Sequence, residues 1–321
     1  MQKLDVSNSP SLTVLNCQNC ARLTELNIGD TPDLEVLKFG GTRIESIDLS
    51  NKPKLQTLEC NWKIKNPDVS QNTELTWLKC YISGTLDLSN NSALTHLECD
   101  GNITSLDLNN NTNLTELYIG ALNSTVKNSI TQLNLQANTA LKKLWIYYSP
   151  FTTLDVSANK NLEILGLFST GLTSLDVKEN TALKDLRVCD AHLTSLDVSD
   201  NKNLTNLRCS GNQLTFLDLK GNTKLTDFFG SNCKRTIAVG SDNKFDLTTL
   251  PTGFDINKTS NWQGGRVVDN DLIVDSDAST VTYSYDTDNA KAGKVMFTLD
   301  VHRHSYEWKH DGTSHWKECS D

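Results

Sequence analysis

A unit of about 21 residues recurs along most of the chain and constrains its fold more than any other feature. The clearest copy runs from Leu193 to Leu214 and reads LTSLDVSDNKNLTNLRCSGNQL. A Leu-Asp pair or its equivalent marks one copy at each of eleven positions: Asp5, Asn27, Asp48, Asp68, Asp87, Asp107, Asn134, Asp155, Asp176, Asp197 and Asp218. The last five markers are spaced at 21 residues, and a longer spacing after Asp107 marks an insertion.

Each copy is too short to bury its own leucines. It can close one turn of chain with the leucines inward, and it then needs another coil above and below to cover them. Periods of about 20–29 residues with leucines at these offsets are typical of leucine-rich repeats. The sequence therefore predicts a repeat fold, a parallel β-solenoid of about eleven coils over residues 1–232, mainly β and with little helix.

The LxxLxC segment of each coil is expected to form a strand whose intervening residues point outward, onto the concave surface. Large aromatic or imidazole side chains occupy these positions in five coils: Trp77, Tyr81, His96, Tyr118, Trp145, Tyr147 and Phe168. Such a stripe predicts a ligand-binding surface. The alternative is that the rings pack on one another and stabilise the sheet. Protein and glycan ligands both fit this stripe, and the sequence does not choose between them.

An asparagine just after the strand, such as Asn212 or Asn102, is expected to turn inward and bind backbone groups of the next coil. Most coils have another residue there, including Thr42, Ser149, Thr170 and Ala191. The sequence therefore predicts a broken asparagine ladder.

Five of the nine cysteines occupy one inward strand position: Cys17, Cys60, Cys80, Cys99 and Cys209. Other coils place Phe39, Ile119 or Leu167 at the same position. Because apolar residues share this position, we expect buried, reduced thiols that pack as small hydrophobic groups.

The repeat ends near residue 232, and three further segments are expected. Residues 233–250 are a transition segment. Residues 251–303 form a small antiparallel β module that caps the solenoid, with strands at Thr280–Tyr285 and Val295–Val301 joined by a turn at Asp286–Gly293. Residues 304–321 form a His/Trp/Cys tail with an incomplete motif. The insertion at Ala121–Ser129 is expected to form a polar loop, either functional or merely tolerated.

Composition excludes several classes of partner. The net charge is −9 without a basic cluster, so nucleic acid is not expected. No apolar run reaches the ~18–20 residues of a membrane helix, so membrane insertion is not expected either. We expect a monomer without cofactors. Targeting and anchor signals are absent, and Met1 lies within a coil, so we expect a piece of a longer protein.

The tail offers the chain's weak candidates for a metal site, namely His304, His315 and Cys319. Zinc prefers four closing Cys or His ligands, and one Cys without a CxxC partner is a poor match. A Cys-His nucleophile pair would also need an oriented base and a substrate pocket, which nothing in the sequence suggests. We therefore expect neither a metal site nor an enzyme.

The units LTSLDVSDNKNLTNLRCSGNQL and LTHLECDGNITSLDLNNNTNL resemble the cysteine-containing 21-residue leucine-rich repeats of bacterial cell-surface proteins of the internalin J-like family. This resemblance implies a right-handed horseshoe, export, and extracellular or cell-surface attachment. It also implies adhesion to a host or environmental protein or glycan. The alternative function is a structural spacer that presents another domain from the cell surface.

Overall fold

The structure is a computed structural model that describes residues 1–121, 127–303, 306–310 and 315–319, the last two ranges by their backbone alone. Contacts divide the chain into two compact units, Met1–Ala191 and His192–Asp321.

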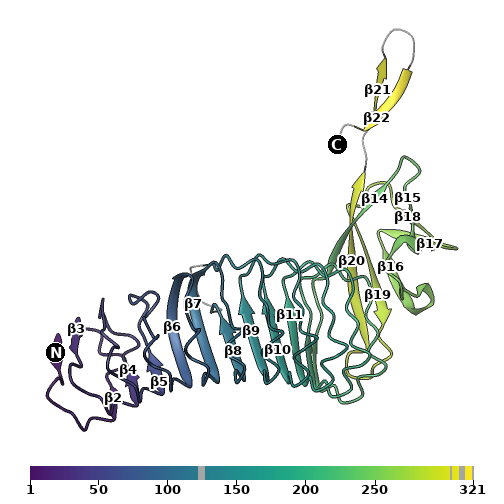
Figure 1. Ribbon diagram of the computed structural model, residues 1–321. Helices are drawn as coiled ribbons and strands as arrows, with labels where there is room; N and C mark the ends of the chain where they lie inside the picture. The colour runs from purple at the N-terminus through teal and green to yellow at the C-terminus, as the bar shows by residue number, and fades with distance from the viewer. Residues whose placement is uncertain (122–126, 304–305, 311–314, 320–321) are drawn as a thin grey trace. The chain divides into compact units, whose positions relative to one another are not determined.

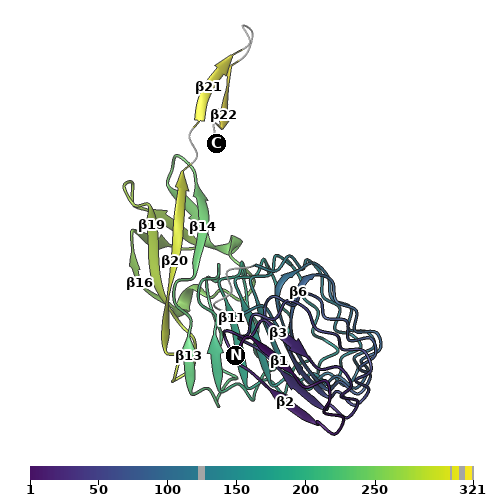
Figure 2. The same ribbon diagram turned by 90° about the vertical axis from the view of Figure 1, so that its left-hand side faces the viewer.

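The first unit is a stack of coils that each contribute a short strand to one parallel sheet (Figure 1). In sheet order the strands are β2 (Val14–Asn16), β4 (Val36–Lys38), β5 (Thr57–Glu59), β6 (Trp77–Gly84), β7 (His96–Ile103), β8 (Glu116–Ile119), β9 (Lys143–Tyr147), β10 (Ile164–Phe168) and β11 (Asp185–Cys189). Figure 2 shows β1 (Lys3–Asp5) and β3 (Glu25–Asn27) side by side, and they pair in a separate two-stranded sheet.

The second unit begins with coils of the same kind, in which β12 (Asn206–Arg208) pairs in parallel with β13 (Asp227–Phe229). Helix is confined in the described residues to two short 3₁₀ turns, at Leu247–Thr249 and Ile256–Lys258. The prediction of a parallel β-solenoid of about eleven coils, followed by small antiparallel sheets, is confirmed.

The sheet alternates buried and half-buried residues, as its sequence pattern predicts. Along β9, Leu144 and Ile146 are fully buried, while Lys143, Trp145 and Tyr147, which alternate with them, are half-buried. The five cysteines of the shared inward position are buried as thiols. Burial raises the pKa of the Cys80 thiol to about 12, so it stays protonated and packs as an apolar group.

A column of buried asparagines ties the coils together. Within each unit it consists of the fourth residue after the marker: Asn72, Asn91, Asn111, Asn138, Asn159 and Asn180 in the first unit, and Asn201 and Asn222 in the second. In Asn159, Nδ2 donates to the backbone carbonyls of Leu135 at 3.0 Å and Asn138 at 2.9 Å, both on the preceding coil. The column satisfies backbone acceptors that water cannot reach. At the corresponding position of an earlier coil, the Lys52 ammonium donates to the carbonyl of Gly29 at 2.7 Å.

This column is not the ladder considered in the sequence analysis, which is broken at the position just after the strand by the buried residues Thr42, Ser149, Thr170 and Ala191. Asn212 does turn inward and accepts a hydrogen bond from the amide of Leu193 at 3.1 Å, whereas Asn102 is exposed. The ladder that was not predicted from the sequence lies after the marker, because the carbonyls of that turn are buried and need donors.

The second unit also contains two small sheets. One has the order β14 (Lys234–Val239), β20 (Lys294–Arg303), β19 (Thr280–Asp286) and β16 (Thr259–Gln263). The other has the order β15 (Lys244–Asp246), β18 (Asp271–Val274) and β17 (Gly265–Val268). The strands predicted at Thr280–Tyr285 and Val295–Val301 are confirmed as β19 and β20, which are antiparallel. Strand β14, from the predicted transition segment, joins β20 in parallel.

The turn after β19 binds the coils of the second unit in the manner of one more coil. Asn289 Nδ2 donates to the carbonyls of Leu219 and Asn222, both at 3.1 Å. The amide of Leu219 donates to the carbonyl of Thr287 at 2.9 Å. The hydroxyl of Tyr283, a buried side chain, donates to the carbonyl of Thr215 at 2.5 Å. Asn289 therefore continues the hydrogen bonding of the ladder beyond Asn222.

Two predicted segments are described only in part. Of the loop predicted at Ala121–Ser129, residues 122–126 lie outside the described residues. In the tail, β21 (Tyr306–His310) pairs with β22 (His315–Cys319), and His304 lies outside the described residues. No helix in the described residues has the length and apolar character needed to cross a membrane.

Candidate binding face

The candidate site is the outward face of strands β6 to β11, hereafter the strand face. Its side chains alternate with buried leucines, so a rigid sheet positions each of them. The seven residues predicted as a stripe all lie on this face and are all half-buried: Trp77, Tyr81, His96, Tyr118, Trp145, Tyr147 and Phe168. They do not form one continuous stripe, because ring contacts divide most of them into two clusters.

The first cluster is centred on His96. Its ring stacks on Trp77 with centroids 4.9 Å apart and planes 7° apart, and it lies 5.3 Å from the ring of Tyr118. The Lys38 ammonium lies over the Trp77 ring, 5.3 Å from its centroid. Since Lys38 comes from an earlier strand and His96 from the following one, the indole is covered from both directions along the sheet.

The second cluster consists of Trp145, Tyr147 and Phe168. The three rings are nearly parallel, with interplanar angles of 4° to 11° and centroids 5.0 to 6.3 Å apart. The Arg187 guanidinium lies over the indole of Trp145, 5.3 Å from its centroid. Tryptophan, tyrosine and arginine, which meet in this cluster, are the residue types enriched at protein-binding hot spots.

Glycines on neighbouring strands make room for two of these rings. Gly166 is the register partner of Trp145, and a Cβ atom at Gly166 would lie 2.2 Å from the indole Cε3. The ring of Tyr81 also lies against Gly101, where a Cβ would come 2.8 Å from Cε1 and 2.3 Å from the backbone oxygen of Ile82. The rings thus occupy space that side chains on the next strand would otherwise fill.

The charged side chains of the strand face pair with one another. Lys79 lies 2.7 Å from Glu98, and Lys143 lies 2.8 Å from Glu116. Arg187 donates from Nε and Nη2 to the two carboxylate oxygens of Asp185, at 3.0 and 2.8 Å. Two-point contacts of this kind fix the guanidinium plane, which here also covers Trp145.

Glu116 links the ion pairs to the first aromatic cluster. It accepts the hydroxyl proton of Tyr118 at 3.0 Å, and its Oε2 lies 3.3 Å from His96 Nδ1. Burial and the adjacent Glu116 carboxylate raise the pKa of Tyr118 to about 12, so Tyr118 is a neutral donor. Burial lowers the pKa of His96, against the opposing effect of Glu116 and Glu98, so its neutral form is favoured.

Sequence reasoning missed two residues that complete the second cluster, Arg187 and Gly166. Both stand at outward strand positions in register with Trp145, and counting two residues from each first strand leucine would have found them. It also missed Trp62, which follows β5 and is 62% exposed. The Lys63 ammonium lies over the Trp62 ring, 5.6 Å from its centroid.

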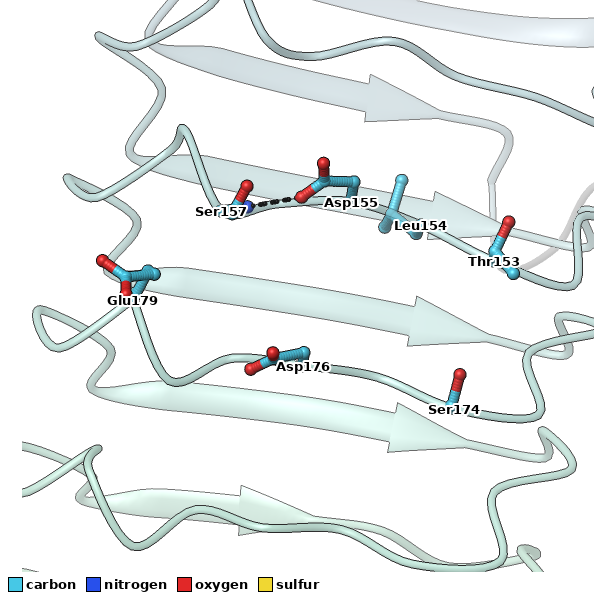
Figure 3. A pocket seen from close by; sticks show the side chains of 7 residues that line it. All are labelled: Thr153, Leu154, Asp155, Ser157, Ser174, Asp176 and Glu179. Atoms are coloured by element: carbon cyan, nitrogen blue, oxygen red, sulfur yellow. Dashed lines mark hydrogen bonds between the residues drawn. The ribbon is translucent and has the colours of Figure 1, made fainter.

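A hollow between two coils offers a different kind of surface. Figure 3 shows its lining of Thr153, Leu154, Asp155, Ser157, Ser174, Asp176 and Glu179. The carboxylates of Asp155 and Asp176 accept backbone amide protons two residues further on, at 2.9 and 3.0 Å. The carboxylates thereby close turns of their own coils.

No group of three or more His, Cys, Asp or Glu side chains arranged to hold a metal occurs among the residues that the structure describes. Of the weak metal candidates, His315 and Cys319 lie in β22, which is described by its backbone alone.

Comparison with protein-family models and with curated proteins returned no match. Solved structures do match. The functional domain of InlJ from Listeria monocytogenes, which includes a cysteine ladder, is 25% identical with a TM-score of 0.52 over 94% of this chain and 83% of that chain. An internalin, InlF, from Listeria monocytogenes is 19% identical with a TM-score of 0.52, over 75% of each chain.

A third similar structure is a plant peptide hormone receptor, RGFR1, in complex with RGF2. It is 16% identical with a TM-score of 0.53, over 73% of this chain and 47% of that chain. The chain thus has the leucine-rich-repeat fold and is similar to internalins in fold and repeat.

Proposed function

We propose that this internalin-like chain is a non-enzymatic binding protein that acts outside a bacterial cell, secreted or attached to its surface. It adheres to a host or environmental protein through the strand face. The observation that carries the proposal is the pair of aromatic clusters on a rigid, solvent-facing sheet, one of them joined by Arg187. The similar plant receptor is solved in complex with RGF2, which supports a protein-binding role for this fold.

The ring arrangement favours a protein ligand over a glycan. A sugar would stack on an open aromatic face, but Trp77 lies between Lys38 and His96, and the Tyr147 and Phe168 rings stack on each other at 5.0 Å. A protein partner can instead use the outer edges of these rings together with the polar groups around them.

The alternative function is a structural spacer that holds another domain away from the cell surface. The observation that favours it is the same stacking, since cross-strand aromatic pairs also stabilise a sheet without any ligand.

Binding to a panel of extracellular-matrix proteins, mucin and purified glycans tests the proposal. The chain is compared with the triple variant Trp77→Ala/Tyr118→Ala/Trp145→Ala and with Trp62→Ala, which removes an exposed tryptophan outside the strand face. Far-UV circular dichroism and thermal melting establish that each variant is folded.

We expect the native chain and Trp62→Ala to bind one of the panel proteins, and the triple variant to bind it more than about tenfold more weakly. Equal binding by the folded triple variant would show that the strand face is not the binding surface. A panel without any binding would favour the spacer.

A further inference from the structure

The strand face is close to electrically neutral although the chain as a whole is acidic. The outward positions of β6 to β11 carry three basic and four acidic side chains, so their charges nearly balance at −1. They are Lys79, Lys143 and Arg187 against Glu98, Asp100, Glu116 and Asp185.

These charges are also satisfied within the face. Each of the three basic side chains pairs with an acidic neighbour at 2.7 to 2.8 Å. The remaining acid, Asp100, accepts the backbone amide proton of Gly101 at 2.7 Å. Apart from a single basic group beside Asp100, a charged partner would have to compete with these pairs or lose its own hydration without gaining a new partner, and both cost free energy.

Resting on the proposed function, we propose that the strand face recognises an uncharged polypeptide segment rich in aromatic and aliphatic side chains. Such a segment packs on the edges of Trp145, Tyr147 and Phe168 and on the half-buried Ile164 beside them. It leaves every ion pair of the face in place. Binding is then driven by burial of apolar surface and is nearly independent of ionic strength.

The dimensions of the sheet set the length of the segment. Six parallel strands spaced ~4.8 Å apart span ~24 Å, which an extended chain covers with about seven residues. A 12-residue peptide is therefore long enough to cross both aromatic clusters.

The test is selection of random 12-residue peptides, displayed on phage, against the immobilised full chain. Peptides that also bind the folded Trp145→Ala/Phe168→Ala variant are removed. We expect the remaining peptides to be rich in Trp, Phe, Leu and Pro and poor in Asp, Glu, Lys and Arg. For a synthetic copy of the strongest binder, we expect Kd to change less than about twofold between 0.05 and 0.5 M NaCl.

A second variant, Lys79→Gln/Lys143→Gln, keeps all aromatic rings and leaves Glu98 and Glu116 without their lysine partners. Selection on this variant is expected to yield peptides that contain Lys or Arg, with salt-sensitive binding. This readout is independent of the folding of the aromatic variant.

The outcomes separate the two proposals. Charged peptides that need Trp145 and Phe168, with a Kd that rises steeply with salt, would overturn the proposal of an uncharged segment. The proposal that the strand face is the binding surface would stand. If every peptide enriched on the native chain is removed because it also binds the folded aromatic variant, both proposals are overturned. A selection without enriched peptides on the native chain would also overturn the neutral-segment proposal.

Discussion

His96 is a titratable side chain enclosed by aromatic and charged neighbours. Trp77 and Tyr118 face its ring, Glu116 contacts Nδ1, and the charges of Glu98 and Lys143 lie close enough to act on it. Its Nε2 atom is buried without a hydrogen-bond partner, and the side chain is only 18% exposed. The neutral imidazole fits this site better than the charged one.

We therefore predict that the chain loses stability as the pH falls below the unfolded-state pKa of histidine, about 6.5. Burial lowers the pKa of His96 in the folded state, so the unfolded state binds the proton at a higher pH. Proton binding therefore stabilises the unfolded state relative to the folded one. The measurement is the free energy of unfolding in urea between pH 8 and pH 5. In His96→Phe the part of this dependence that His96 causes should vanish, and an unchanged profile would contradict the assignment.

Glycine at position 166 is predicted to be required for the position of the Trp145 ring. In Gly166→Ala, the new Cβ would lie 2.2 Å from the indole, so the ring must move against its neighbours. Overpacking of this kind costs about 1–3 kcal/mol. We expect a lower free energy of unfolding in urea and an altered tryptophan fluorescence spectrum.

Gly40→Ala is the matched control. Its Cβ would meet only the end of the flexible Glu59 side chain, at 2.6 Å from Oε1, which can swing away. A loss of stability as large as that of Gly166→Ala would show that the indole contact is not the cause.

At the scale of the coil, the asparagine ladder is predicted to be a main source of cohesion. Asn159→Ala leaves the carbonyls of Leu135 and Asn138 buried without their side-chain donor. Each unsatisfied buried acceptor costs about 1–3 kcal/mol. Urea unfolding measures the loss, and Asn161→Ala, which removes an exposed hydrogen bond to Thr139, should cost less than about 1 kcal/mol. Equal losses would contradict a special role for the ladder.

The coil as an element was predictable because its signal is periodic. Leucines such as Leu144 and Leu165 recur at fixed offsets, and only stacked coils bury them all. The ladder was not found because each of its asparagines stands in a polar run such as Asp200-Asn201-Lys202, which is typical of a solvated turn. The signal that could have revealed the ladder is that an asparagine stands four residues after the marker in coil after coil.

The candidate residues were predictable as a set but not as contacts. Alternation along the strands places Trp145 and Phe168 outward. Which rings meet depends on the register between strands and on the rotamer of each ring, for example the lean of Trp145 across Gly166. Neither is encoded in the spacing of one coil, and so two clusters were predicted as one stripe.

At the scale of the whole molecule, the second unit is predicted to depend on Asn289. Asn289→Ala removes the hydrogen bonds to the carbonyls of Leu219 and Asn222 and should destabilise the attachment of β19 and β20 to the coils of that unit by about 1–3 kcal/mol. Hydrogen–deuterium exchange should speed up in β19 and β20 and remain unchanged in β6 to β11.

The exposed Asn270 provides the control for this prediction, because Asn270→Ala should leave exchange unchanged throughout. Uniformly faster exchange in both units of Asn289→Ala would contradict a local role for this side chain.

The ladder has a consequence for how such a chain can change over time. The rungs at Asn159 and Asn180 use the same side chain, the same two carbonyls and the same offset, so these neighbouring coils are interchangeable. Removal of the 21 residues 157–177 would bring Asn180 onto the rung that Asn159 now occupies, and the ends would be unaffected. A gene could therefore lengthen or shorten the solenoid by whole coils, sampling new combinations of outward side chains without redesigning the core.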